Sequence, residues 1–365
     1  LVDGEFVGAI ADARGLSVDE VRALIDEGPA SPAEFEKARL SDGIKYLRTV
    51  HDALGGEQTP LVDIEDYAAT DFADLGLGVG PRIGVLYASG TIVAGESGTS
   101  LNGATVGAET LAEALEEAAE DDDIKALVMR VDSPGGSALA SDLIWRARRA
   151  VQDRKPVVVS MSDLAASGGY YISVGADRIL AQPTTLTGSI GVVVARPMIR
   201  GLLADAGITS ETLTRGRFAH MSDLTVPLGP AGKERLGAQV GHVYREFVDR
   251  VAAGRRMTAD AVDGVARGRV WTGAQAVEQG LVDELGGFWD AVGAAKQLAG
   301  IDADAEVELV YYPRPKPLAE RIAASLGMGA EARLPQALAD VVAALVPPFA
   351  PGTVLALMPF AVEIR

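Results

Sequence analysis

Three short segments combine serine with glycine in a way that could support nucleophilic chemistry. They are D-S-P-G-G-S at residues 132–137, L-A-A-S-G-G-Y-Y-I-S at residues 164–173 and T-L-T-G-S-I-G at residues 185–191. The hydroxyl of Ser167 could act as a nucleophile if a base takes its proton. Gly135 and Gly136 have no Cβ to cover their backbone amides, and such amides can stabilise an oxyanion. The three loops together, in this order, are far more specific than any one of them.

Each loop alone also has a purely structural interpretation. Ser137 could cap the helix that follows it, and Ser167 could be an ordinary N-cap serine. Ser189 could be a turn serine, or it could donate a hydrogen bond to a catalytic base. Ser167 does not fit the nucleophile elbow of α/β-hydrolases, because that motif needs glycine where the chain has Ala165.

The loops follow segments that are predicted to be strands. Short apolar runs at residues 82–88, 125–131, 156–161 and 178–181 alternate with helical segments at 108–119 and 139–151. This alternation predicts βαβ units, and open parallel sheets place their sites just after the strands. Residues 6–42 and 230–300 are predicted to be mostly helical. An acidic, glycine-containing stretch at residues 63–80 resembles a linker.

Composition excludes several classes of function. The chain has 365 residues, a formal net charge of −18 and no cysteine. The negative charge argues against nucleic acid as a partner. The missing cysteines exclude disulfides, thiolate catalysis and zinc–thiolate sites. The chain starts at Leu1 without a signal peptide, so we expect a piece of a longer protein. The apolar C-terminal run is interrupted by prolines, and a docked tail, a subunit contact or a membrane-surface segment all fit it.

The sequence also contains an internal repeat. F-V-G-A-I-A-D-A-R-G-L-S-V-D-E-V, which begins at Phe6, pairs without a gap with F-V-D-R-V-A-A-G-R-R-M-T-A-D-A-V, which begins at Phe247. The same shift of 241 residues pairs Asp42 with Asp283. In the second copy this helical part follows a βα core. The equivalent core of the first copy would lie before Leu1, so the chain is expected to start within its first repeat.

The three loops, together with G-R-V-W-T-G-A-Q-A-V-E-Q-G-L-V-D-E-L-G at residues 268–286, resemble bacterial signal peptide peptidases of the serine–lysine type, also called protease IV. The resemblance is strong over residues 80–300. It implies an α/β fold with the ββα spiral core of Clp proteases and crotonases and with flanking helices. The long form of the family carries two tandem copies in one chain, which agrees with the repeat.

The resemblance also implies roles for particular residues. Ser167 would be the nucleophile, and Ser189 would orient the base. The amides of Gly135, Gly136 and Gly168 would bind the oxyanion. The base of this family is a lysine, and a lysine can serve when burial lowers its pKa. No metal or organic cofactor is implied.

The lysine expected by the resemblance is not at the matching position. In the short form of the family it lies in the turn that corresponds to Thr214–Asp223, where this chain has Arg215 and Arg217 but no lysine. Arginine cannot lose a proton at a useful pH. In the long form the lysine belongs to the first repeat, so we expect it upstream of residue 1. None of the lysines present stands in the matching motif; they are Lys37, Lys45, Lys125, Lys155, Lys233, Lys296 and Lys316.

Three alternatives also fit the sequence. His220 lies in the same turn and could be the base of a Ser167–His220 protease. A crotonase-type acyl-CoA enzyme would share the fold. A non-catalytic assembly subunit of the same fold would need no base at all.

The predicted organisation has three parts: residues 1–72 are the helical end of a truncated first repeat, residues 73–312 the catalytic domain and residues 313–365 a C-terminal tail. By resemblance, the substrates are hydrophobic peptides such as signal-peptide remnants. The intact protein is expected to form a homo-oligomer, a tetramer in the long form. An upstream anchor is expected to hold it at the extracytoplasmic face of the cytoplasmic membrane.

Overall fold

The computed structural model describes residues 2–56, 80–100 and 103–313. Contacts divide the chain into two compact units, one formed by residues 81–313 and another that includes residues 1–80. Most of the expected linker and nearly all of the expected C-terminal tail lie outside the described residues. Within the described residues, no helix combines the length and the apolar composition that crossing a bilayer requires.

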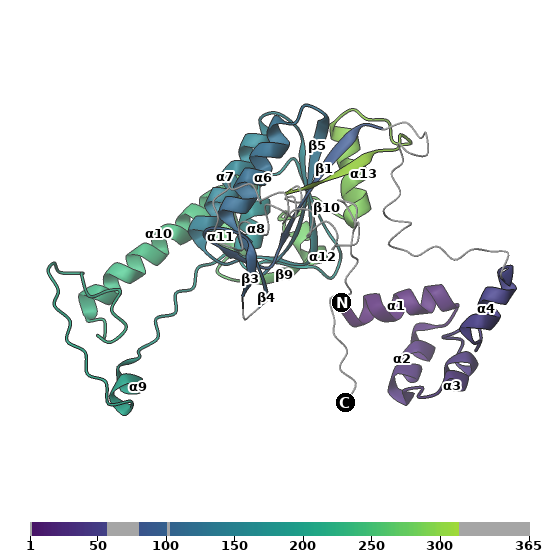
Figure 1. Ribbon diagram of the computed structural model, residues 1–365, viewed down its shortest axis with the longest axis horizontal. Coiled ribbons are helices and arrows are strands. Elements are labelled where there is room, and N and C mark those ends of the chain that lie inside the picture. Colours follow the sequence, from purple (N-terminus) through teal and green to yellow (C-terminus); the bar gives the residue numbers. More distant parts are fainter. Residues whose placement is uncertain (1, 57–79, 101–102, 314–365) are drawn as a thin grey trace, which may run out of the picture. The chain divides into compact units, whose positions relative to one another are not determined.

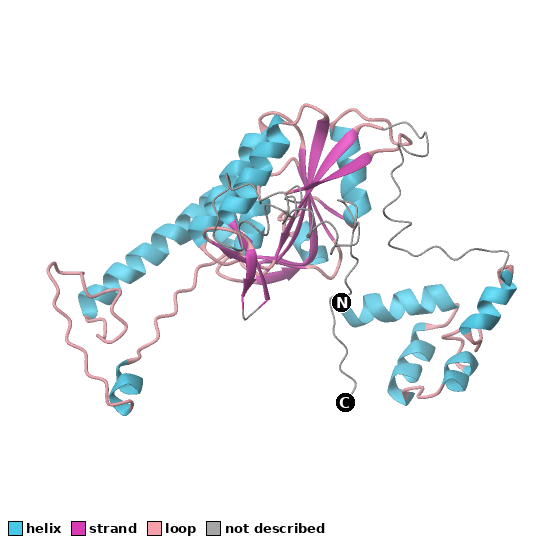
Figure 2. Ribbon diagram, viewed as in Figure 1, coloured by secondary structure: helices cyan, strands magenta, loops and turns pink. Residues whose placement is uncertain are grey.

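The larger unit is an α/β domain (Figures 1 and 2). Its strands are β1 (Arg82–Ser89), β2 (Thr91–Val93), β3 (Gly98–Ser100), β4 (Gly103–Gly107), β5 (Ile124–Ser133), β6 (Val157–Ala166), β7 (Arg178–Ala181), β8 (Leu186–Gly188), β9 (Val270–Thr272), β10 (Glu284–Leu285) and β11 (Glu308–Tyr312). Its helices are α6 (Ala108–Glu120), α7 (Ala138–Gln152), α8 (Gly168–Ser173), α9 (Arg200–Asp205), α10 (Pro230–Arg255), α11 (Ala259–Val265), α12 (Gly273–Glu278) and α13 (Phe288–Leu298).

The main sheet has the strand order β10-β7-β6-β5-β1-β11, and all of these pairs are parallel. Strand β8 pairs with the carboxyl end of β6, and β9 runs antiparallel to β8. A smaller sheet has the order β2-β4-β3. The strands and helices expected at residues 82–88, 108–119, 125–131, 139–151, 156–161 and 178–181 are confirmed.

The central strands are apolar on both faces because helices cover both faces (Figure 1). On β5, Leu127 and Met129 are fully buried in the cluster that also contains residues of α6 and α7. The alternate residues Ala126 and Val128 are buried in a second cluster, which contains residues of α13. The sheet therefore forms the middle layer, and the loops of the site begin where its parallel strands end.

The smaller unit contains four helices among its described residues: α1 (Val2–Arg14), α2 (Val18–Glu27), α3 (Pro32–Lys37) and α4 (Leu47–Ala53). Each has a counterpart at the shift of 241 residues that the sequence repeat predicts: the end of α10, then α11, α12 and α13. The N-caps correspond as well, with Ser17 and Ser31 in the first copy and Thr258 and Thr272 in the second.

The repeat also extends to individual hydrogen bonds. In the first copy, Arg14 donates from Nε to the Arg39 carbonyl (2.6 Å) and forms an ion pair with Asp42 (3.2 Å). In the second, Arg255 donates from Nε to the Gly280 carbonyl (2.8 Å) and pairs with Asp283 (2.7 Å). Each partner is displaced by the same 241 residues. The weak sequence repeat is therefore a structural repeat.

The two copies differ in what covers them. Phe247 is 3% exposed in the core of the larger unit, whereas its counterpart Phe6 is 59% exposed. Likewise, Ala291 on α13 packs beneath the sheet, whereas Val50 on α4 is exposed. In the second copy α13 packs against the sheet and the end of α10 packs against α8, and the first copy carries exposed apolar side chains at matching positions.

Residues 192–229, which we call the arm, connect β8 to α10. Arg196 holds the arm together, because its guanidinium donates to the carbonyls of Met221 (3.3 Å), Asp223 and Val226 (2.8 Å). Apolar side chains on the arm are largely uncovered, with Val193 and Leu213 each 92% exposed.

Candidate functional site

Ser167 lies in the turn between β6 and α8, at the carboxyl edge of the main sheet. Its backbone angles are φ 51° and ψ −115°, a combination that is unfavourable for any residue with a side chain. The turn is held on both sides, because the Ser167 N–H donates to the Gly188 carbonyl (2.9 Å) and the Tyr171 N–H donates to the Ser167 carbonyl (2.8 Å). Strained residues that the surrounding structure fixes in this way cluster at functional sites.

The hydroxyl of Ser167 does not cap the helix. Although the residue occupies the N-cap position of α8, its side chain makes no capping hydrogen bond. The ordinary N-cap interpretation is therefore wrong for Ser167, whereas Ser137 does cap α7 by accepting from the Ala140 N–H (3.3 Å). The sharp strand-to-helix turn presents Ser167 as a nucleophile elbow would, without the glycine that the elbow motif requires.

The loop of residues 132–137 packs directly against the Ser167 turn. A Cβ on Gly135, which has φ 94°, would lie 2.4 Å from the Gly168 nitrogen, and a Cβ on Gly168 would lie 3.1 Å from the Gly136 nitrogen. A Cβ on Gly136 would collide with the Ile92 carbonyl oxygen at 2.0 Å. Glycine is therefore required in this loop, because the two backbones approach each other too closely for side chains.

The structure distinguishes between the predicted oxyanion donors. The N–H of Gly135 donates to Ser133 Oγ (3.1 Å) inside the protein, so it does not face the site. Gly136 and Gly168 both line the cavity that contains Ser167. Within the described part of the chain, no group accepts a hydrogen bond from either of their N–H groups. The geometry therefore favours Gly136 and Gly168 as the oxyanion donors, with Gly135 shaping the turn.

Ser189 is brought to the same cavity by strand pairing. Ala166 and Gly188 are paired residues of β6 and β8, so the serines that follow them emerge side by side. Ser189 also has a left-handed backbone, with φ 49°, and its N–H donates to the Arg269 carbonyl (2.7 Å). Both serines line one cavity, as expected if Ser189 contacts a group that acts on Ser167.

The cavity has a volume of about 880 Å³ and a largely apolar wall. Helix α10 supplies Leu236, Val240, Val243 and Phe247 to it, at the three- and four-residue spacing of one helical face. Tyr171 lies on the α8 side of the cavity and donates to Asp142 Oδ1 (2.7 Å). Burial, followed by this hydrogen bond, raises the pKa of Tyr171 to about 12, so its hydroxyl stays protonated at neutral pH.

No lysine or histidine is among the described residues that line this cavity. Burial lowers the pKa of Lys155, which is the direction needed for a base. However, Lys155 precedes β6 and Ser167 follows it, and a strand of this length spans roughly 30 Å. Lys316 lies outside the described residues. Also within the described ranges, no group of three or more His, Asp or Glu side chains could hold a metal ion.

His220 does not lie at the site either. It belongs to the arm and is not among the residues that line the cavity with Ser167. The arrangement brings the Ser167 hydroxyl, the N–H groups of Gly136 and Gly168 and an apolar wall to one cavity. These parts can position a peptide carbonyl and stabilise its tetrahedral adduct, but the proton acceptor is missing from the described part of the site.

Comparison with known proteins agrees with this chemistry. The sequence profile of peptidase family S49 matches residues 149–302. The chloroplastic serine protease SPPA of Arabidopsis thaliana is 37% identical over 331 residues, which are 88% of this chain and 49% of that protein. Protease 4 of Salmonella typhi is 36% identical over 310 residues, which are 85% of this chain and 47% of that protein.

A shorter relative is matched over most of its own length. A protein of Synechocystis sp. that is named as a protease is 38% identical over 203 residues, which are 56% of this chain and 73% of that protein. The chain spans about half the length of the Arabidopsis and Salmonella relatives. The family match and the parallel α/β architecture confirm the fold class expected from the sequence. The chain belongs to peptidase family S49.

Proposed function

We propose that this chain carries the nucleophile of a serine endopeptidase that works with a serine–lysine dyad. One observation carries the proposal: the Ser167 hydroxyl, which makes no capping hydrogen bond, lies in a strained turn and shares one cavity with Gly136 and Gly168. Hydroxyl and donors in this arrangement are suited to attack on a peptide carbonyl and to stabilisation of the oxyanion that forms.

In the proposed reaction, Ser167 Oγ attacks the scissile carbonyl carbon while a neutral lysine amine takes the hydroxyl proton. The N–H groups of Gly136 and Gly168 donate to the oxyanion of the tetrahedral adduct. The lysine then gives its proton to the leaving amine, which departs and leaves an acyl ester on Ser167. Water, deprotonated by the same lysine, hydrolyses the ester and restores the serine. Ser189 holds the lysine amine in place by a hydrogen bond.

The lysine is proposed to come from the sheet-containing part of the first repeat, upstream of residue 1. The structural repeat supports this origin, since α1 to α4 reproduce the helices that pack against the βα core in the second copy. The exposed apolar residues Phe6 and Val50 occupy positions that are buried there. The missing proton acceptor in the described part of the cavity supports the same origin.

The proposed substrates are hydrophobic peptides, including signal-peptide remnants. The apolar wall of α10 supports this class, because Val240, Val243 and Phe247 would bury apolar side chains of a peptide bound next to Ser167. We also propose that an upstream anchor holds the protein at the extracytoplasmic face of the cytoplasmic membrane. Self-association as a tetramer is proposed too; exposed residues of the arm such as Val193 and Leu213 support a contact between copies.

The proposal is tested with a fluorophosphonate probe and a fluorogenic hydrophobic peptide. Both are applied to this chain, to the chain extended upstream through its first repeat, and to Ser167→Ala in the extended protein. We expect labelling and cleavage by the extended protein only, and their loss in Ser167→Ala.

Other outcomes point to other functions. Equal activity of the short chain would place the base within it and would reopen the case for His220. Unchanged biological function of the extended Ser167→Ala protein would favour a non-catalytic assembly subunit.

A further inference from the structure

Helix α8, which follows Ser167, is too short to hold its own position. It contains six residues, and all of them are buried. Helices of this length are not stable in isolation, so their direction is set by contacts with their surroundings. The position of Ser167 Oγ and the direction of the Gly168 N–H therefore depend on whatever holds α8.

One face of α7 makes several of these contacts, beside the hydrogen bond from the Tyr170 hydroxyl to the Leu281 carbonyl (2.9 Å). Asp142, Trp145 and Arg148 follow one another at three-residue intervals, so they share a face of the helix. Trp145 Nε1 donates to the Val174 carbonyl at the end of α8 (3.0 Å), and Arg148 Nη2 donates to the same oxygen (2.8 Å). Asp142 accepts from the Tyr171 hydroxyl within α8 (2.7 Å). We call these three α7 side chains the bracket.

Arg148 is an unfavourable residue to place there for stability alone. Its side chain is fully buried, and its Nε has no hydrogen-bond partner in the described structure. Apart from the Val174 carbonyl, Arg148 donates to the neutral Gln152 Oε1 (2.9 Å), and Gln152 Nε2 donates in turn to Asp177 Oδ1 (2.8 Å). Burial lowers the pKa of Arg148 to about 9. A charge buried at this cost indicates a role other than filling the core.

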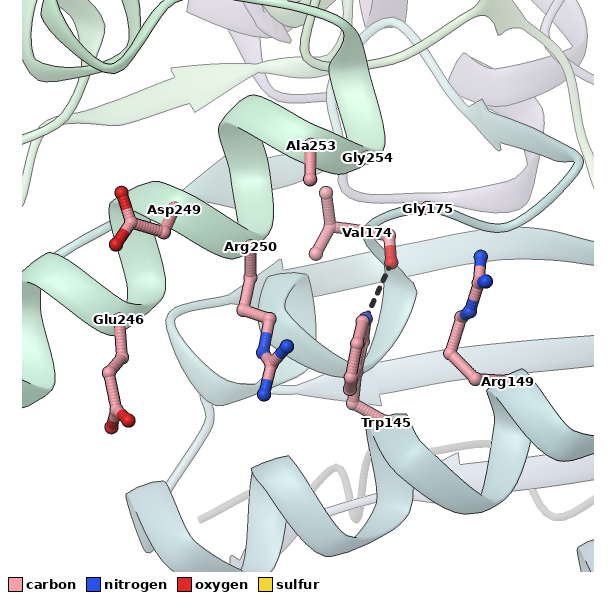
Figure 3. A pocket seen from close by; sticks show the side chains of 9 residues that line it. All are labelled: Trp145, Arg149, Val174, Gly175, Glu246, Asp249, Arg250, Ala253 and Gly254. Carbon is pink, nitrogen blue, oxygen red and sulfur yellow. Dashed lines mark hydrogen bonds between the residues drawn. The ribbon is translucent and has the colours of Figure 1, made fainter.

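Helix α10 also contacts the bracket, through Arg250. Arg250 lies over the Trp145 ring, 4.1 Å from its centroid, and pairs with Asp142 (3.3 Å). Figure 3 shows Trp145 between Arg250 and the Val174 carbonyl, with the indole hydrogen bond drawn as a dashed line. Each bracket residue thus contacts α8 directly, and two of them are fixed in turn by Arg250.

We propose that Trp145 and Arg148 are positioning residues, which hold the Val174 end of α8 and thereby aim Ser167 and the Gly168 N–H at the substrate carbonyl. The inference rests on the proposed function, because it takes Ser167 as the nucleophile. Neither residue is among those that line the cavity with Ser167. Removing both donors frees the Val174 carbonyl and lets α8 pivot, which should affect the chemical step and leave ground-state binding nearly unchanged.

The test compares Trp145→Phe, Arg148→Met and the double variant in the extended, base-containing protein. A misplacement of about 1 Å can lower a rate by roughly a hundredfold. We expect kcat to fall more than tenfold in the double variant, with KM changed less than twofold. Thermal unfolding of each variant is measured alongside, because a buried carbonyl that loses both of its donors destabilises the fold. Arg148→Lys, which keeps one charged donor, should recover most of the rate.

Hydrogen exchange of residues 164–176 provides a second readout, which needs no base and is measured on the present chain. We expect protection there to fall at least tenfold in the double variant, with the rest of the unit unchanged. Arg146→Met, on an exposed face of the same helix, is the matched control and should change neither readout.

Two outcomes would overturn the bracket. One is a double variant that keeps wild-type kcat and protection. The other is a double variant in which kcat falls, KM rises and the Tm falls together, with hydrogen-exchange protection lost throughout the unit. If Ser167→Ala keeps its activity, the proposed function fails, and the exchange experiment still decides whether the bracket holds α8.

Discussion

The structural repeat allows a matched comparison of two ion pairs that share geometry but differ in burial. Arg255 is 9% exposed and its partner Asp283 35%, whereas Arg14 is 25% exposed and Asp42 is 95% exposed. Replacing each arginine by alanine removes the same set of bonds from each copy. Because only one of the two carboxylates is left partly buried, we expect Arg255→Ala to destabilise its unit much more than Arg14→Ala destabilises the other.

The magnitude follows from the burial of the carboxylate that remains. Breaking a fully buried pair costs about 3–5 kcal/mol. Asp283 is about one-third exposed and still accepts from the Ile179 N–H (2.8 Å), so about 2 kcal/mol is expected for Arg255→Ala. Arg14→Ala should cost about 0.5 kcal/mol, as exposed pairs do. At about 2–4 °C per kcal/mol, the Tm of the larger unit should fall by about 4–8 °C in Arg255→Ala.

The assay is differential scanning calorimetry of both variants with urea unfolding as an independent measure. The corresponding changes Asp283→Asn and Asp42→Asn serve as controls for side-chain volume. If Arg255→Ala and Arg14→Ala cost the same within about 0.5 kcal/mol, burial does not decide the strength of these pairs, and the reasoning is refuted.

Three further predictions concern the site. Gly136→Ala places a Cβ 2.0 Å from the Ile92 oxygen and should lower kcat of the extended protein about a hundredfold, whereas Gly241→Ala, with room on α10, should not; peptide cleavage measures both. Because the pKa of Tyr171 is raised to about 12, the protonated hydroxyl stabilises the fold below pH 10, and this stabilisation should be lost as the pH rises from about 10 to 12. Urea unfolding should show that the free energy of unfolding falls less over this pH range in Tyr171→Phe than in the wild type. Val240→Asp should raise KM for apolar peptides more than tenfold in steady-state assays, since it places a charge on the apolar wall; an unchanged KM would exclude this wall from binding.

Much of the fold could be predicted because its signals are local. Strands β1, β5, β6 and β7 of the main sheet contain apolar runs, and the glycines of residues 132–137 mark a loop in which a Cβ would collide with neighbouring backbone. Strands β2, β3, β4, β8, β9, β10 and β11 were not predicted, since segments of two to five residues are too short to show a clear hydrophobic period.

The site could be predicted only in part. Ser167, Ser189, Gly136 and Gly168 stand in recognisable loops, and the structure brings them to one cavity. The hydrogen bond that the Gly135 N–H donates to Ser133 Oγ could not be predicted from the sequence, because it depends on the backbone path of the turn. Arg148 was missed for a similar reason: an arginine among Arg146 and Arg149 suggests a solvated helix face, and only packing against α8 buries it.

The backbone of Ser167 has a consequence for the choice of inactive variants. An L-residue held at φ 51° and ψ −115° costs about 1–3 kcal/mol, which glycine would largely avoid. Replacing Ser167 by glycine should therefore give an inactive protein that is more stable than the wild type, whereas alanine keeps the strain. Alanine is thus the better substitution for trapping a bound peptide with the turn intact. A copy of this domain that no longer cleaves peptides would gain stability by losing its serine, so activity and stability oppose each other at this position.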